Sequence, residues 1–240
     1  MDIIRTPSPN FDSRKGQSID MLVLHYTGMQ SGEAALQRLY EAEASVSAHW
    51  LVEEDGRIFQ LVDEEQRAWH AGVSAWRGHT NVNARSVGIE IVNPGHEFGY
   101  RAFPPVQTDA VLKLAQAIVA RHAIAPRNVV GHSDVAPTRK QDPGELFPWA
   151  AFAKQGVGLW PTELLPPHAA ETEGAQVAEL QADLNKLGYG LPVSGEWDAL
   201  TRDVIAAFQR HWRPEHVDGE WDAVCSQRLA SLLHQLSDEV

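Results

Sequence analysis

Three residues of types that bind zinc, His25, His132 and Asp142, each stand where an apolar segment runs into a loop. His25 ends the apolar run 21–24, and His132 and Asp142 lie ten positions apart. A catalytic zinc has three protein ligands and keeps a fourth position for water, whereas a structural zinc is usually closed by four ligands, mostly cysteines. Two imidazoles and one carboxylate leave a zinc ion with one net positive charge. The set therefore favours metal-assisted hydrolysis.

Two further charged residues supply groups that such a reaction needs. Glu90 lies in the sequence Gly88-Ile89-Glu90-Ile91, an otherwise apolar strand in which a carboxylate is costly unless it faces a polar site. We expect it to be the general base that takes a proton from water. Lys140, two residues before Asp142, would stabilise negative charge on a carbonyl oxygen if its loop is extended.

Alternating strand and helix patterns occupy the segment from about residue 20 to 153. The hydrophobic periodicity predicts strands at 21–25, 47–52, 57–62, 86–92 and 128–130 and helices after Gly32 and at 106–122. The short helix after Gly32 is expected to place Leu36, Leu39 and Tyr40 on one face. Strands 47–52 and 57–62 flank a Glu-Asp-Gly turn, which indicates a β-hairpin. We expect an α/β (α+β) fold with a mixed central β-sheet flanked by helices.

The rest of the chain predicts a separate, smaller unit. Residues 156–174 contain prolines and acidic residues without periodicity, a composition suited to a linker between domains, although Trp160 can pack on the first domain. Residues 175–240 show three amphipathic helical patterns and a weak internal repeat, because two similar Gly-Glu-Trp-Asp turns precede the second and third helices. We expect a catalytic domain at 1–155 and a three-helix C-terminal domain at 175–240.

Composition excludes several classes of partner. The 240 residues carry 20 basic against 32 acidic side chains, a net charge of −12 that disfavours binding to nucleic acid or anionic lipid. No apolar stretch approaches the length of about 20 residues that spans a bilayer. The single cysteine, Cys225, excludes an internal disulfide and is expected to be a buried apolar residue. We expect a monomer without a nucleic-acid or membrane partner.

Five separated motifs together resemble a known family. They occur in order as Leu24-His25-Tyr26-Thr27, Ser47-Ala48-His49-Trp50-Leu51-Val52, Trp69-His70-Ala71-Gly72, Ser86-Val87-Gly88-Ile89-Glu90, and the stretch from Gly131-His132-Ser133-Asp134 to Lys140-Gln141-Asp142-Pro143-Gly144. This order is similar to that of the zinc N-acetylmuramoyl-L-alanine amidases of the amidase-2 type, which are related to phage T7 lysozyme and the peptidoglycan recognition proteins. Ala48 stands where the T7-type branch has a catalytic-site tyrosine, which places the chain nearer the bacterial AmpD and AmiD enzymes.

The resemblance implies a role for each candidate catalytic or metal-binding residue. It implies that His25, His132 and Asp142 bind Zn²⁺, that Glu90 is the general base and that Lys140 stabilises the tetrahedral intermediate. His49 is expected to support the core. The C-terminal unit, with Leu187-Gly188-Tyr189, Phe208-Gln209 and Asp218-Gly219, resembles a three-helix peptidoglycan-binding module.

Substrate contacts are predicted from residue type and position. His70 and Trp76 would contact sugar or peptide. Asn83 and Arg85, just before the Glu90 strand, would hold a peptide or lactyl carboxylate, with exposed loop charge as the competing interpretation.

The hypothesis is hydrolysis of the amide between N-acetylmuramic acid, or its 1,6-anhydro form, and L-alanine of the stem peptide. Two alternatives are a non-catalytic muropeptide recognition protein and a zinc peptidase that cuts within the stem peptide. The first 21 residues contain charged side chains and no apolar segment of the kind found in export signals, so we expect a cytoplasmic location. If a signal was removed before residue 1, the periplasm is the alternative location. The sequence does not decide between polymeric sacculus and soluble anhydro-muropeptides as the substrate.

Overall fold

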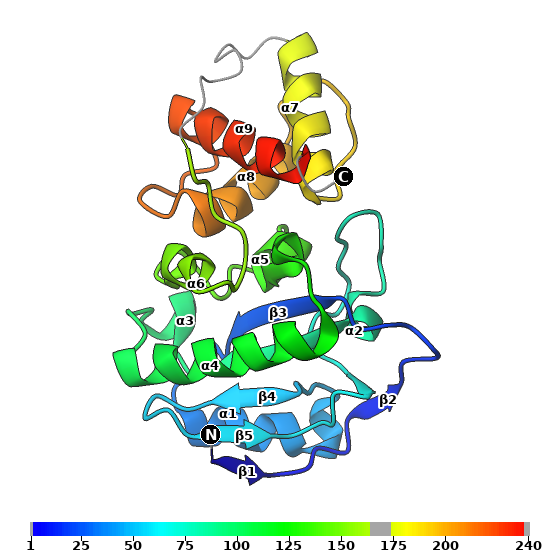
Figure 1. The fold of residues 1–240 in the computed structure, drawn as a ribbon, viewed down its shortest axis with the longest axis vertical. Coiled ribbons are helices and arrows are strands. Elements are labelled where there is room, and N and C mark those ends of the chain that lie inside the picture. Colours follow the sequence, from blue (N-terminus) through cyan, green and yellow to red (C-terminus); the bar gives the residue numbers. More distant parts are fainter. Residues whose placement is uncertain (1, 164–173, 238–240) are drawn as a thin grey trace.

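The computed structural model describes residues 2–163 and 174–237 (Figure 1). Within the first range, six strands form one sheet with the order β1-β5-β4-β7-β3-β8. Their bounds are β1 (Ile3–Arg5), β5 (Ile58–Gln60), β4 (Trp50–Val52), β7 (Ser86–Ile91), β3 (Met21–Tyr26) and β8 (Val129–Gly131). Only β4 and β5 pair antiparallel, and the other neighbours pair parallel. The predicted mixed sheet and the predicted β-hairpin are therefore confirmed.

One face of the sheet is covered by the long helix α4 (Pro105–His122), which crosses in front of the strands in Figure 1. Leu22 and Leu24 of β3 pack with Ile89 of β7 and with the α4 residues Leu114 and Ile118. Because side chains alternate along a strand, every second residue of β3 and β7 must lie on the opposite face. His25 and Glu90 lie on that opposite face.

Two parts of the chain cover the opposite face of the sheet. Helix α1 (Gly32–Tyr40) packs against the β4–β5 end through Ala35 and Leu39, and β3 contacts the C-terminal unit through Met21 and Val23. Ser31 caps α1, since its side chain accepts a hydrogen bond from the backbone N–H of Ala34. The sheet surface over β3 and β7 lies between α1 and the C-terminal unit, and it carries His25 and Glu90.

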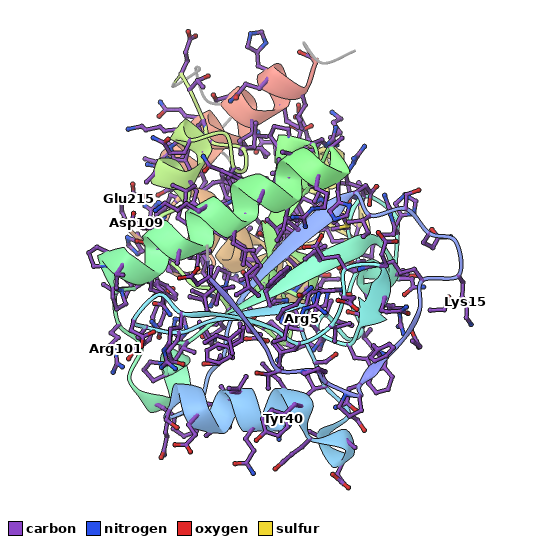
Figure 2. All side chains as sticks on the ribbon, turned by 60° about the horizontal axis from the view of Figure 1, so that its bottom comes forward. Arg5, Lys15, Tyr40, Arg101, Asp109 and Glu215 are labelled. Carbon is purple, nitrogen blue, oxygen red and sulfur yellow. The ribbon has the colours of Figure 1, made fainter. Side chains whose placement is uncertain are left out.

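Short elements complete this unit. They are β2 (Phe11–Ser13) and β6 (Gln66–Ala68), which form a second sheet, α2 (Val82–Arg85), α3 (Gly95–Phe98), α5 (His132–Val135), α6 (Trp149–Lys154) and the 3₁₀ turns Ala42–Ala44 and Pro126–Asn128. The prediction for α1 was wrong in one respect, because Tyr40 is 41% exposed and only Leu39 of the expected apolar face is fully buried. Figure 2 labels Tyr40 at the end of this helix.

The C-terminal unit contains the three predicted helices, α7 (Gly174–Leu187), α8 (Ala199–Trp212) and α9 (Ala223–Ser237). The weak sequence repeat has a structural counterpart in two buried glutamines. Gln181 on α7 accepts hydrogen bonds from two backbone N–H groups of the first Gly-Glu-Trp-Asp turn, and Gln209 on α8 does the same for the second. Each turn is thus fixed by an amide on the helix that precedes it.

The two units share one hydrophobic cluster. Val23 and Val135 of the first unit belong to it together with Tyr189, Phe208 and Trp212 of the second. The predicted domain boundaries stay a prediction, and residues 164–173 of the proposed linker lie outside the described residues. The part of the linker before them packs closely, since Leu159 is buried and its carbonyl accepts a hydrogen bond from the indole N–H of Trp212. No helix in the described ranges is long and apolar enough to cross a membrane.

Candidate metal centre and active site

His25, His132 and Asp142 converge on one point above the sheet. His25 is on β3, His132 begins α5 directly after β8, and Asp142 lies in the loop that follows α5. The Nδ1 atoms of the two histidines are 2.9 Å apart, and each is 3.0 Å from Asp142 Oδ2. Among the described residues this is the group whose ligand atoms could hold a metal ion.

These separations fit a zinc ion. Zinc bonds of 2.0–2.2 Å in tetrahedral geometry place ligand atoms about 3.3–3.5 Å apart, a few tenths of an ångström more than the distances between these atoms. Burial, with the neighbouring His132, lowers the pKa of His25 to about 4, so its imidazole is neutral at pH 7. Burial alone would raise the pKa of Asp142, but His132 and His25 outweigh it and hold that pKa well below its usual range. Neutral imidazoles and an ionised carboxylate are the forms that bind zinc.

Hydrogen bonds at the far sides of both rings leave Nδ1 free for the metal. His25 Nε2 lies 3.0 Å from His70 Nδ1, and His70 Nε2 lies 3.2 Å from Ser86 Oγ, whose hydroxyl donates to the Val82 carbonyl at 2.8 Å. All of these groups are satisfied if His25 donates from Nε2 to His70 Nδ1 and His70 donates from Nε2 to Ser86 Oγ. Metal-binding histidines commonly donate their other N–H in this way, which fixes tautomer and ring orientation.

His132 is oriented by a backbone group. Its Nε2 lies 3.1 Å from the carbonyl oxygen of Ala71, which also accepts a hydrogen bond of 2.8 Å from the guanidinium of Arg139. Both predicted histidine ligands therefore have a partner that selects Nδ1 coordination.

Gly88 lets His70 reach this position. A Cβ atom built on Gly88 would lie 2.6 Å from His70 Cγ and 2.7 Å from its Nδ1. A glycine inside a strand often marks a close approach of this kind. His70 is 5% exposed, and its hydrogen bonds to His25 and Ser86 make it a support for the His25 ring. It also borders the cavity, and its expected contact with substrate stays a prediction.

Glu90 and Lys140 both line the cavity that is also lined by the ligands His132 and Asp142. Glu90 is the register partner of His25 on the adjacent parallel strand, which puts both side chains on one face of the sheet. Its Oε2 is shielded from solvent and has no hydrogen-bond partner among the described residues. Burial raises the pKa of Glu90 well above its usual range, the charge of Asp142 adds to this, and Lys140 opposes it. An unpartnered carboxylate with a raised pKa suits a general base.

The cavity has a volume of about 660 Å³. Its lining includes Tyr26 and His96, which are joined by a hydrogen bond of 2.9 Å, and Leu39 and Arg38 of α1. Pockets of this size take ligands of several hundred daltons. Two of the three ligands, His132 and Asp142, also line it.

Three of the predicted substrate residues lie elsewhere. Trp76 is 1% exposed and packs edge-to-face on Tyr189 of the C-terminal unit. Asn83 is buried, and its Oδ1 accepts hydrogen bonds from the backbone N–H groups of His70 and Ala71. Arg85 pairs with Asp20 at the start of β3. None of these three lines the cavity described here. Their contacts among the described residues are packing and support, and their expected roles as substrate contacts stay a prediction.

Sequence reasoning missed residues that orient the site. The Ala71 carbonyl carries no residue-type signal, and Arg139 was not distinguished from Lys140 beside it. Gly88 did offer a signal, because it interrupts the apolar strand that carries Glu90.

Comparison with known proteins agrees with this geometry. The family model described as N-acetylmuramoyl-L-alanine amidase matches residues 15–145, more than half of the chain. The chain belongs to the N-acetylmuramoyl-L-alanine amidase family. Amidases of this family are zinc-dependent in general, and the amidase domain here has a His-His-Asp cluster that can bind a metal. A second model, described as a putative peptidoglycan binding domain, matches residues 173–229.

Similar proteins match either nearly the whole chain or about three fifths of it. The amidase is 39% identical to AmiD of Escherichia coli K12, over 92% of this chain and 84% of AmiD. It is 33% identical to AmpD of Citrobacter freundii over 62% of this chain and 87% of AmpD. Among solved structures, the complex of E. coli AmiD with anhydro-N-acetylmuramic acid-L-Ala-D-gamma-Glu-L-Lys superposes with a TM-score of 0.79 at 37% identity, covering 96% of this chain and 93% of that one. AmpDh3 of Pseudomonas aeruginosa gives a TM-score of 0.78 at 34% identity, covering 98% and 96%.

Proposed function

We propose that this protein is a zinc amidase that hydrolyses the bond between N-acetylmuramic acid, or its 1,6-anhydro form, and L-alanine of the stem peptide. His25, His132 and Asp142 would hold the zinc ion. The observation that carries the proposal is the placement of Glu90, with its unpartnered Oε2, and of Lys140 in one cavity with His132 and Asp142, with Glu90 the register partner of His25. A site that only recognises its ligand has no need of a buried, unpartnered base.

When bound, the zinc ion would polarise the scissile carbonyl and lower the pKa of water at the open position. Glu90 takes a proton from the water that attacks the carbonyl carbon, and the carbonyl oxygen gains negative charge. Lys140 stabilises that charge through its ammonium group. Glu90 then gives the proton to the departing amine of L-alanine as the C–N bond breaks. The reaction consumes one water molecule and releases the free stem peptide, and it leaves a carboxyl group on the lactyl part of the muramic acid.

The substrate class is supported by the relatives and by the groove. The AmiD structure similar to this chain contains an anhydro-muramyl tripeptide. The cavity of about 660 Å³ is lined by His132 and Asp142 of the metal centre and also by Tyr26, His96 and Arg38. It is therefore large enough for a sugar-peptide ligand of several hundred daltons.

The test is mass spectrometry of the products. The zinc-loaded protein would be incubated with 1,6-anhydro-muropeptides and, separately, with intact sacculi, each with and without a chelator. We expect free stem peptide of unchanged length that disappears with the chelator and returns when zinc is restored. A shortened peptide still attached to the sugar would instead indicate a peptidase. No cleavage by protein with bound zinc would contradict the amidase and favour recognition.

A further inference from the structure

The C-terminal unit reaches the metal centre through one buried carboxylate. Asp134 lies on α5, the single helical turn that begins with His132, and is 1% exposed. Its Oδ1 accepts a hydrogen bond of 2.7 Å from the Tyr189 hydroxyl, and its Oδ2 accepts one of 2.7 Å from His211 Nδ1. Both donors belong to the C-terminal unit. Figure 1 shows α5 directly beneath this unit, beside α8.

The same carboxylate holds the local backbone. Asp134 Oδ2 also accepts a hydrogen bond of 2.7 Å from the backbone N–H of Gly131, the residue before His132. Ser133, the residue after His132, donates its backbone N–H to the carbonyl of Asp142 at 2.9 Å. A movement of α5 would therefore displace two of the three ligands, His132 directly and Asp142 through its backbone.

The two donors are themselves held rigidly. Tyr189 is 2% exposed, and its ring packs edge-to-face on Trp76 with centroids 5.2 Å apart. His211 is stacked between Trp149 and Trp212, with centroids 3.7 Å from each. Burial, together with the charge of Asp134, raises the pKa of Tyr189 well above its usual range, so its hydroxyl remains a donor. A carboxyl group buried as deeply as that of Asp134 is tolerated only when hydrogen bonds satisfy its oxygens.

We propose that Tyr189 and His211 are positioning residues for the metal centre, which through Asp134 fix the turn that carries His132. This inference rests on the proposed function, since it takes His132 as a zinc ligand. The C-terminal unit is then a structural part of the active site in addition to any role in binding peptidoglycan. Without the two donors, Asp134 keeps only the Gly131 N–H among its described partners, and α5 loses its fixed position.

The experiment compares single substitutions in the full-length protein. Tyr189→Phe removes one hydroxyl and keeps the ring, and His211→Leu removes the other donor. His211→Asn is the rescue variant, because its amide N–H₂ can occupy the place of Nδ1. Gln235→Met is the matched control, since it removes the hydrogen bond from α9 to the Trp160 carbonyl, which involves none of Asp134, Tyr189 and His211.

Two readouts do not depend on catalysis: zinc affinity by competition with a chromophoric chelator, and the visible spectrum of the cobalt-substituted protein, which reports ligand geometry. We expect Tyr189→Phe and His211→Leu each to weaken zinc binding by about tenfold, the lower end of what removal of a supporting partner costs, and to change the cobalt spectrum. His211→Asn should recover most of the affinity, and Gln235→Met should match wild type in both readouts.

Equal zinc affinity and identical cobalt spectra in wild type and Tyr189→Phe would overturn the inference. So would equal losses in Gln235→Met and Tyr189→Phe, because general destabilisation would then account for the effect. If His211→Leu does not fold, Tyr189→Phe decides alone, since it removes only one oxygen atom. The inference is separable from the proposed function: a wild type that binds zinc but cleaves no muropeptide contradicts the amidase assignment, while the affinity comparison still tests the positioning role.

Discussion

Replacing Gly88 by alanine should weaken zinc binding, although Gly88 touches no ligand. The new Cβ would lie 2.6 Å from Cγ and 2.8 Å from Cδ2 of His70, whereas carbon atoms in contact are separated by about 3.5–4.0 Å. The ring must then move by about 1 Å. It is held between His25 Nε2 at 3.0 Å and Ser86 Oγ at 3.2 Å, so a shift of that size breaks at least one of these hydrogen bonds.

The expected loss is about 10- to 100-fold in zinc affinity, the usual effect of losing a histidine's supporting partner, equivalent to about 1.4–2.7 kcal/mol. Competition titration with a chelator measures it. The control is a double-mutant cycle with His70→Ala. Once the ring is absent, Gly88→Ala has nothing to displace and should add no further loss. Additive losses, or unchanged affinity in Gly88→Ala, would refute the reasoning that His70 orients His25.

Three other predictions concern catalysis and stability. Lys140→Met should lower kcat by about 10²–10³ in steady-state assays while zinc content stays that of wild type; an unchanged kcat would exclude its oxyanion role. Glu64 is buried, which raises its pKa, but hydrogen bonds from Arg121 and His122 outweigh this and lower it. Its stabilising contribution is therefore complete above the unfolded pKa of about 4.3 and is lost as the pH falls through the lower folded pKa. Glu64→Gln should reduce the free energy of unfolding in urea by about 1.5–3 kcal/mol at pH 7, with a gap that closes below about pH 4; a gap independent of pH would contradict this. Gln209→Met leaves two backbone N–H groups of its turn without their acceptor and should cost about 1–3 kcal/mol in the same assay, whereas an unchanged midpoint would show that the turn is held by other contacts.

The sequence predicted the strands that carry the site because their apolar runs are long enough to show a pattern. Met21–Tyr26 and Ser86–Ile91 were predicted to within one residue at each end. His25 and Glu90 stood out because each is a polar residue in one of these apolar runs. The register that pairs these two residues is a property of the folded sheet. It could not be derived from either strand alone.

The burial of Trp76 could not be predicted from the sequence. Tryptophan and arginine beside a catalytic motif resemble substrate contacts, but Trp76 is buried against Tyr189, more than a hundred residues later in the chain. That burial depends on how the two units dock, which periodicity does not encode. The four-residue turn α5 was missed because it is too short to show a helical period, although it carries His132 and Asp134.

The central claim is that Glu90 is the base of a zinc-dependent hydrolysis. Glu90→Gln keeps the size of the side chain and removes its ability to accept the proton, so it tests this claim most directly. The measurement is the rate of stem-peptide release from 1,6-anhydro-muropeptides, with zinc content determined on the same sample. The account predicts a fall of about 10²–10⁴ with zinc still bound at one ion per chain. A rate within a few-fold of wild type in zinc-loaded Glu90→Gln would contradict it.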